Sequence, residues 1–241
     1  MKTKIVIAAM AAMIGFAPVA KAEDLISEKA LGGKFSANAA MTTEYFFRGL
    51  TQSGKGNPAV QGGFDFAHNS GVYLGTWGSS INFGGNVETD FYAGWSGEVG
   101  GDAKVGLDAG VILYHYPSAK GSSNFDFWEG YVALSKDLGF AAASAKVSYS
   151  PDYTVSSGDS VYVEAGLDIP AGKYFTINLH AGHQWVDNNT LFGFDDYSDY
   201  LVGVSFGLAG FSAQIAYIGT DLPSAQVADD GRLMASISRS F

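Results

Sequence analysis

The sequence predicts an all-β fold, an antiparallel transmembrane β-barrel of about twelve strands. Three observations favour it: apolar residues that recur at every second position, connections that alternate between short and long, and a composition rich in glycine, tyrosine and phenylalanine. A soluble β-sandwich is the main alternative, but its outer faces normally carry more lysine than these strands supply. A barrel also leaves no open sheet edge in lipid, where unpaired backbone groups are costly.

Two-residue periodicity marks the strands. Every odd position of residues 105–113 is apolar, whereas even positions include Asp108 between two glycines. Residues 161–169 repeat the pattern, with Glu164 and Asp168 on the polar face. Successive side chains of a strand point to opposite faces, so these runs predict strands with one apolar and one wet face. On this basis we expect strands at 34–48, 59–68, 72–82, 88–98, 103–116, 125–136, 140–150, 160–169, 173–185, 197–208, 211–219 and 231–241, most of them long enough to cross a bilayer.

The connections between these strands alternate in length. Short periplasmic turns and longer outer loops are typical of outer-membrane barrels, and an even strand number places both termini on the short-turn side. We expect no single loop of this length to form a large plug, although several could fold inward together. The tight turns are at 69–71, 99–102, 137–139, 170–172 and 209–210, and the longer loops are at 49–58, 83–87, 117–124, 151–159, 186–196 and 220–230.

The first residues predict a cleaved export signal. Lys2 and Lys4 precede an apolar stretch over residues 5–16, and Ala20 and Ala22 supply small residues where a signal peptidase reads. The apolar stretch is shorter than the ~20 residues that a membrane-spanning helix needs. We therefore expect a signal peptide at 1–22, a short periplasmic leader at 23–33 and a transmembrane β-barrel at 34–241.

Charge and the C-terminal residue indicate the partners. The chain has a formal charge of −10, and loss of Lys2, Lys4 and Lys21 with the signal leaves 11 basic against 24 acidic residues, a charge of −13. Such a charge argues against nucleic acid. Phe241 closes an alternating strand, as in the C-terminal signal of outer-membrane barrels. The expected partners are therefore outer-membrane lipid, the barrel-assembly machinery and small hydrophilic solutes, in the outer membrane of a Gram-negative bacterium. The chain has no cysteine, so no disulfide can contribute to its stability.

The strand registers divide the side chains between lipid and lumen. The expected lipid-facing residues are Phe64, Phe66, Phe91, Trp95, Trp128, Val132, Leu134, Val202, Val204 and Phe206. The expected lumen-lining residues are Glu44, Arg48, Asp65, Glu88, Asp90, Lys104, Asp108, Glu129, Lys146, Glu164, Asp168 and Asp199, together with Gln61 and Tyr131. Carboxylates predominate in this set, which predicts a weak preference for cations if water fills the interior.

Two functions follow for such a lumen. The favoured one is passive diffusion of small hydrophilic solutes through a porin-like channel. The alternative is a plugged barrel with a structural or surface-binding role, because twelve strands lie between the ~8 of a packed barrel and the ~16–18 of an open channel.

An enzyme is disfavoured, and no cofactor or metal is expected. His180 and His183 are three residues apart on a strand, so they point to opposite faces and cannot share a metal ion. The acidic loop around Asp195 matches no calcium-binding pattern. An outer-membrane hydrolase could use His115 with a loop serine, namely Ser118, Ser122 or Ser123, but a rim histidine in an aromatic belt is the favoured interpretation.

One stretch resembles a known family. Residues 44–53 (EYFFRGLTQS), 58–63 (PAVQGG) and 71–79 (GVYLGTWGS) resemble the opening of the TorF-type porins, proteobacterial outer-membrane proteins of poorly known function. The resemblance is specific over residues 36–95 and continues to the C-terminus as strand pattern only. It implies an outer-membrane barrel and a porin-like role.

The same stretch carries a hypothesis about the lumen. We expect Arg48 where the first strand leaves the membrane and Glu44 below it on the same face, about 13 Å away. Each would then pair with neighbouring strands, Arg48 with an inner-face carboxylate such as Asp65 or Glu88. Four aromatic residues are expected at the membrane interface: Tyr45, Phe47, Tyr73 and Trp77.

Overall fold

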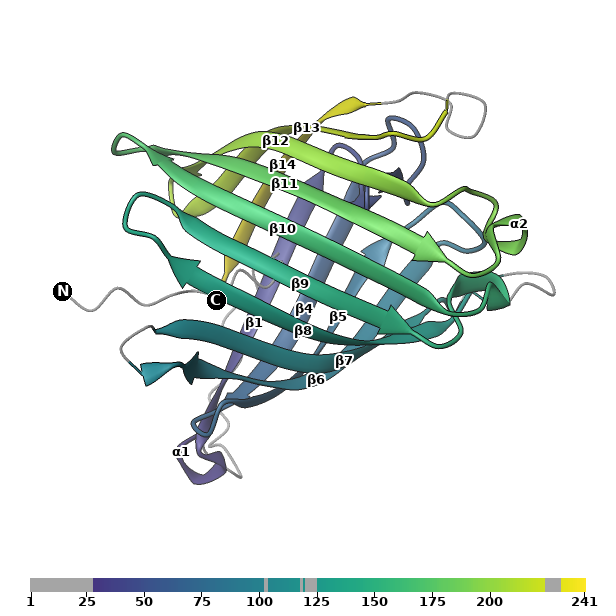
Figure 1. The fold of residues 1–241 in the computed structure, drawn as a ribbon. Coiled ribbons are helices and arrows are strands. Elements are labelled where there is room, and N and C mark those ends of the chain that lie inside the picture. The colour runs from purple at the N-terminus through teal and green to yellow at the C-terminus, as the bar shows by residue number, and fades with distance from the viewer. Residues whose placement is uncertain (1–27, 102–103, 118, 120–124, 224–230) are drawn as a thin grey trace, which may run out of the picture.

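Twelve antiparallel strands of the computed structural model close into one barrel, which confirms the predicted fold class (Figure 1). The structure describes residues 28–101, 104–117, 119, 125–223 and 231–241, so the predicted signal peptide and most of the leader lie outside the described residues. The barrel strands are β1 (Gly33–Thr42), β4 (Ala59–His68), β5 (Val72–Ser80), β6 (Val87–Val99), β7 (Val105–His115), β8 (Phe127–Asp137), β9 (Ala142–Ser150), β10 (Ser160–Ala171), β11 (Phe175–Val186), β12 (Tyr197–Leu208), β13 (Phe211–Thr220) and β14 (Arg232–Ser240).

Consecutive barrel strands pair with each other, and β1 closes the ring. It pairs with β4 from Gly33 opposite His68 to Thr42 opposite Ala59, and on its other edge with β14. The C-terminal Phe241 extends this seam, since its backbone N–H donates to the carbonyl of Ala37 at 2.9 Å. The closed ladder leaves no strand edge unpaired, as a lipid environment requires.

Short turns close one end of the barrel and longer loops the other, as Figure 1 shows. We call these the turn end and the loop end. Two short helices, α1 (Glu28–Leu31) at the turn end and α2 (Asn189–Phe192) at the loop end, were not expected, because four residues are too few to show helical periodicity. Among the described residues, no helix is both long and apolar enough to cross a membrane.

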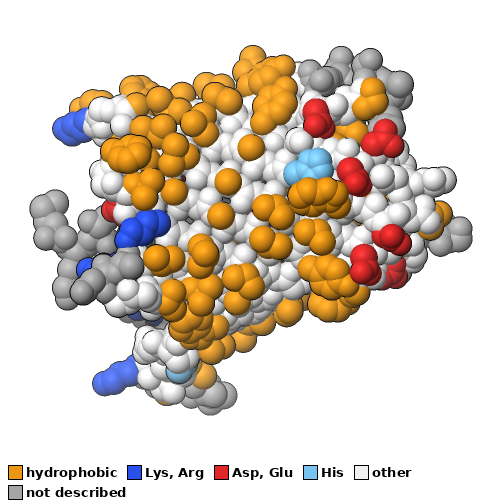
Figure 2. All heavy atoms as spheres, in the orientation of Figure 1, with side chains coloured by type: hydrophobic (Ala, Val, Ile, Leu, Met, Phe, Trp, Pro, Cys, Tyr) orange, Lys and Arg blue, Asp and Glu red, His pale blue; other side chains and the backbone are white. Residues whose placement is uncertain are grey.

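The outer face of the barrel wall is apolar. Figure 2 shows hydrophobic side chains over the wall, with Lys and Arg at the turn end and Asp and Glu at the loop end of the face in view. Phe64 is 66% exposed and Val202 is 54% exposed, both on the outward side of their strands. Outward aromatic residues lie toward both ends of the strands, among them Trp95, Phe140 and Phe175 toward the turns and Trp128, Tyr149 and Trp185 toward the loops. This arrangement is typical of a bilayer-facing barrel.

The first strand is shorter than predicted. It ends at Thr42, and the predicted strand at 34–48 therefore divides into β1 and part of a separate hairpin of β2 (Phe46–Phe47) and β3 (Leu50–Thr51). Phe47 pairs with Leu50 across a two-residue turn, Arg48-Gly49, whose φ angles are 47° and 76°. Two positive φ values are the mark of a type I′ turn, which reverses the chain tightly. The expectation that Glu44 and Arg48 continue the first barrel strand was thus wrong.

Adjacent residues of β13 provide a test of the two faces. Ile215 points outward and is 54% exposed, whereas Gln214 points inward and donates to Asn178 at 3.1 Å. We expect Ile215→Arg to lower the free energy of unfolding in lipid by about 2–4 kcal/mol, because it places a charge in hydrocarbon. Gln214→Arg, at the same depth, is the matched control and should change it by less than about 1 kcal/mol. Urea unfolding followed by tryptophan fluorescence measures both, and equal effects would contradict the assignment.

Candidate functional site: a hairpin inside the lumen

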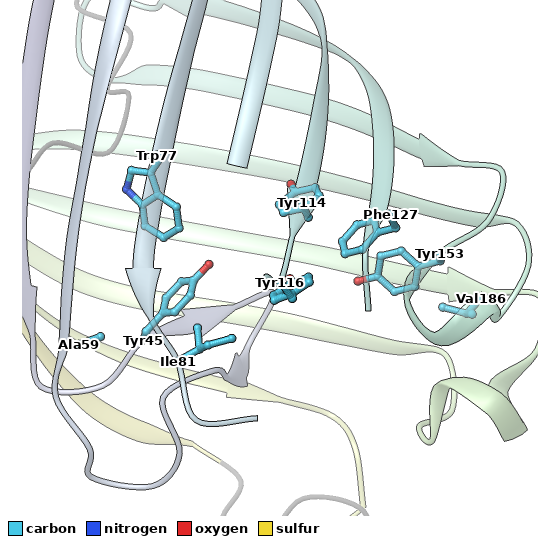
Figure 3. Close-up of a cluster of buried hydrophobic side chains, with 9 residues drawn as sticks. All are labelled: Tyr45, Ala59, Trp77, Ile81, Tyr114, Tyr116, Phe127, Tyr153 and Val186. Carbon is cyan, nitrogen blue, oxygen red and sulfur yellow. The ribbon is translucent and has the colours of Figure 1, made fainter. Parts of the chain in front are cut away.

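The connection over residues 43–58 folds into the barrel at the loop end and carries the β2–β3 hairpin with it. Figure 3 shows Tyr45 from this connection among wall side chains that include Trp77 and Tyr114. The Tyr45 ring lies 5.6 Å from the indole of Trp77, and its hydroxyl donates to Glu88 Oε1 at 2.8 Å. This connection therefore occupies the lumen at the loop end (Figure 3).

Arg48 at the hairpin tip crosses to the far wall. Its Nη2 donates to Glu129 Oε2 at 2.6 Å, and its Nη1 donates to Gln184 Oε1 at 2.7 Å. Arg48 thus pairs with an inner-face carboxylate, as the hypothesis expected, but with Glu129 and not with its examples Asp65 or Glu88. Because the chain reverses at Arg48 instead of continuing in β1, the guanidinium reaches β8 and β11 rather than the adjacent strands.

This ion pair is buried. The side chains of Arg48 and Glu129 are only 5% and 2% exposed. Removing two charges from water is costly, and the pair compensates only because each group also meets polar or aromatic partners. The carbon of the Arg48 guanidinium lies 4.1 Å from the ring centroid of Tyr162 and 4.7 Å from that of Phe47. Loss of one partner would leave the other as an uncompensated buried charge.

The base of the hairpin is held by a second ion pair. Arg232, at the start of β14, donates from Nη1 to Glu44 Oε1. Glu44 Oε2 also accepts from the backbone N–H of Gly56 at 2.8 Å. Ser53 accepts from the backbone of Tyr45 at 2.9 Å and donates to the carbonyl of Asn57 at 2.7 Å. These bonds fold the connection onto itself before it returns to β4.

Aromatic side chains from several elements surround the hairpin. Phe127 stacks on Tyr114 with ring centroids 4.4 Å apart and meets Tyr153, from the loop over 151–159, at 4.6 Å. Burial raises the pKa of Tyr153 to about 12, so its hydroxyl is neutral at physiological pH. Tyr153 in turn contacts Phe192 of α2 at 5.5 Å. The 151–159 loop and α2 thus assist the hairpin, as the expectation of several inward-folding loops allowed.

The four aromatic residues expected at the membrane interface lie inside the barrel instead. Tyr45 and Phe47 belong to the inserted connection, and Trp77 is 7% exposed against Tyr45. Tyr73 donates to Asp108 Oδ1 at 2.6 Å and also contacts the hydroxyl of Tyr131. The prediction failed because an aromatic residue near a strand end suits either face, and the position within the alternation is what decides.

Below the hairpin, toward the turn end, the lumen is polar and partly exposed. Lys146 lies 3.2 Å from Glu164 across β9 and β10. His180 lies between two carboxylates, with Nδ1 3.6 Å from Glu164 and Nε2 3.0 Å from Asp199. The side chains of Lys146, Glu164 and His180 are 30%, 24% and 27% exposed, so water reaches this part of the lumen, which we call the vestibule. Tyr162 and Asp199 are buried at its boundary with the hairpin, where Tyr162 donates to Asp199 at 2.7 Å.

The structure places the predicted lumen residues in three environments. On inward positions of strands lie Asp65, Glu88, Asp90, Asp108, Glu129, Lys146, Glu164, Asp168 and Asp199, with Gln61 and Tyr131. Glu44 and Arg48 lie in the inserted connection. Lys104 lies in the turn before β7, exposed and with a φ of 45°, because the chain enters the sheet only at Val105.

Four residues of the site were missed: Tyr45, Tyr162, Gln184 and Arg232. The last three sit on inward positions of their strands, so the alternation could have identified them as lumenal. Nothing in the alternation indicates which of them meet the hairpin.

The structure does not test the alternative hydrolase site. His115 Nδ1 lies 2.6 Å from Asp126 Oδ2 at the rim. The three serines proposed to accompany it, Ser118, Ser122 and Ser123, lie outside the described residues.

In the part of the chain that the structure describes, no cluster of three or more His, Asp or Glu could hold a metal ion. His180 and His183 face opposite sides of β11, with His180 inside near Asp199 and His183 outside against Trp185.

A family described as "Bacterial protein of unknown function (Gcw_chp)" matches residues 27–241. The chain belongs to the Gcw_chp family. The match does not confirm the TorF-type label that the opening stretch suggested. No curated protein matches the Gcw_chp chain.

Two solved porins share the fold of this Gcw_chp chain. The "KdgM porin" is 10% identical, with a TM-score of 0.53 over 86% of this chain and 99% of that one. The NanC porin is 9% identical, with a TM-score of 0.54 over 86% of this chain and 98% of that one. At this identity the likeness shows a common barrel architecture.

A buried serine can report how firmly the hairpin is held. Ser53 is 3% exposed and the chain has no cysteine, so Ser53→Cys introduces a single, nearly isosteric thiol. We expect Arg48→Ala to speed labelling of this thiol by a water-soluble maleimide about tenfold or more. The variant loses the buried ion pair that holds the hairpin tip to the barrel wall. Arg239→Ala, which removes a guanidinium at the turn end, is the control and should leave the rate unchanged. Equal rates in both variants would show that Arg48 does not hold the hairpin.

Proposed function

We propose that this Gcw_chp protein is an outer-membrane channel of the porin type, through which small hydrophilic solutes diffuse. The observation that carries the proposal is a closed twelve-stranded barrel with an apolar outer face and a polar, carboxylate-rich inner face. A barrel of this kind has its hydrophobic surface in lipid and its hydrogen-bonding surface in water. The shared architecture with two porins supports the same proposal.

The selectivity that we propose is a weak preference for cations. Among the described residues, three basic side chains inside the barrel are each paired with a carboxylate: Arg48 with Glu129, Lys146 with Glu164 and Arg232 with Glu44. Carboxylates without a basic partner of this kind are also found along the described wall, among them Asp65, Asp108 and Asp168. A lumen with this residual charge concentrates cations and repels anions.

A plugged barrel is the second candidate, and one observation favours it. At the level of the hairpin the side chains of Tyr45, Arg48 and Glu129 are all less than a tenth exposed. In this conformation the hairpin occupies the loop end, whereas Lys146, Glu164 and His180 in the vestibule stay about a quarter exposed. The two candidates differ in whether solutes can pass the hairpin. In a channel the hairpin leaves room for them or moves aside, and in a plugged barrel it does neither.

The proposal includes the cellular route. A signal peptide at 1–22 and a short leader at 23–33 would bring the chain to the periplasm, and Phe241 would engage the barrel-assembly machinery. The Phe241 side chain is 55% exposed at the turn end, beside the β1–β14 seam, which supports this contact. We propose no enzymatic activity, cofactor or nucleic-acid partner.

Conductance across planar bilayers tests the channel. We expect discrete current steps and a cation-selective reversal potential in a salt gradient. Glu164→Gln should move the reversal potential toward zero, because it removes one lumenal charge and leaves Lys146 uncompensated. Glu28→Gln, in α1 outside the barrel, should leave it unchanged.

Two results would overturn parts of this proposal. If the folded protein and its Arg48→Ala variant are both silent, the plugged barrel is correct. If steps appear without cation selectivity, the channel stands and the role of the wall carboxylates falls.

A further inference from the structure

The guanidinium of Arg48 occupies a cage whose walls belong to the barrel. Glu129 of β8 and Gln184 of β11 supply the two acceptor oxygens, at 2.6 Å and 2.7 Å. Tyr162 of β10 supplies an aromatic face at 4.1 Å, and Tyr153 a second face at 5.9 Å. A planar, delocalised cation with several donors is the group that such a set of carboxylate, amide oxygen and aromatic faces recognises.

The cage is held in place by contacts that do not involve Arg48. The side-chain nitrogen of Gln184 lies within hydrogen-bond distance of three acceptors that its two N–H groups share: Ser160 Oγ at 2.7 Å and the carbonyls of Trp185 and Val161 at 3.0 Å and 3.1 Å. These bonds leave Gln184 Oε1 directed at the guanidinium. Tyr162 is fixed by its bond to Asp199. Gln184 and Tyr162 therefore have contacts that hold them in position if Arg48 withdraws.

The cage also has unused capacity for hydrogen bonds. Glu129 is 1% exposed, and its Oε1 has no hydrogen-bond partner among the described residues. Arg48 uses the other oxygen of the same carboxylate. A ligand that entered without a hairpin attached could therefore meet both carboxylate oxygens, which is the bidentate geometry that guanidinium and carboxylate groups favour.

The hairpin that delivers Arg48 is a separate element. Its two strands pair with each other and not with the barrel ladder. Arg48 itself has a φ of 47°, a region that non-glycine residues adopt at a cost. A small cavity lies between the hairpin and the near wall of β13 and β14, lined by Phe46, Gly49, Leu50, Ile218, Gly231 and Arg232. The polar contacts of the Arg48 side chain are concentrated at the cage, whereas the backbone at Gly49 packs against Asp199 and Thr220.

We propose that Glu129, Gln184 and Tyr162 form a binding site for the guanidinium group of a passing solute, and that Arg48 is an internal ligand that the solute displaces. The solutes are small organic cations with a guanidinium group, such as a free basic amino acid of that type. Displacement releases the hairpin tip and opens the loop end. The role in solute passage rests on the proposed channel function, whereas the binding site can be measured without it.

Emptying the cage should create a measurable site. In detergent micelles, guanidinium chloride at low millimolar concentration should raise the thermal midpoint of the Arg48→Ala variant by several degrees relative to sodium chloride at the same ionic strength. The wild type should show no shift, because Arg48 fills the cage. The double variant Arg48→Ala with Glu129→Gln should also show none. Arg48→Met keeps the volume of the side chain and repeats the test if the alanine variant does not fold.

Two controls separate the site from general loosening of the hairpin. Arg232→Ala breaks the other ion pair and leaves Arg48 in the cage, so it should not respond to guanidinium. Methylammonium at equal concentration should shift the Arg48→Ala midpoint less, since it lacks the planar fork.

Conductance then tests the transport role. We expect guanidinium to raise the potassium current through the wild type, where it displaces Arg48 and opens the loop end, and to reduce the current through Arg48→Ala, where it only occupies the empty cage. No thermal shift in the folded Arg48→Ala and Arg48→Met variants would overturn the binding site, whatever the currents show. A thermal shift in a protein that never conducts would keep the site and overturn the channel function. A shift that survives Glu129→Gln would place the binding elsewhere.

Discussion

Backbone groups that face lipid must find their hydrogen-bond partners within the protein, because hydrocarbon offers none. The pairing of β1 with both β4 and β14 meets this requirement by closing the ladder on itself. Closure has a second consequence, since each strand then presents alternate residues to lipid and to an enclosed interior. The polar lumen, its carboxylates and the space that receives the hairpin all follow from this single constraint.

The buried ion pair between Arg48 and Glu129 is the main polar interaction at the hairpin tip. It joins an element that the ladder does not include to a wall strand on the far side of the barrel. Such a pair is poor evidence for stability by itself, because desolvation offsets much of the attraction. Its value here is positional: the hairpin is held by a contact that a competing cation could replace, which connects the closed conformation to the chemistry of the solute.

The sequence-based predictions were most accurate where the deciding interaction lies between residues close together in the chain. The outward positions of Phe64 and Val202 were correct, since alternation within one strand decides them. Trp77 was placed on the wrong face, because the aromatic character of a residue was given more weight than its place in the alternation. Lys104 was included in a strand that begins one residue later.

The sequence by itself determined the all-β barrel, its number of strands and the alternation of turns and loops, because periodicity and turn residues act over a few neighbours. Only the tertiary structure decided that residues 43–58 fold inward and that Arg48 meets Glu129 and Gln184. These partners are 81 and 136 residues away in the chain. No local pattern specifies such a contact, because it depends on the curvature of the closed barrel and on which wall side chains leave room for a guanidinium.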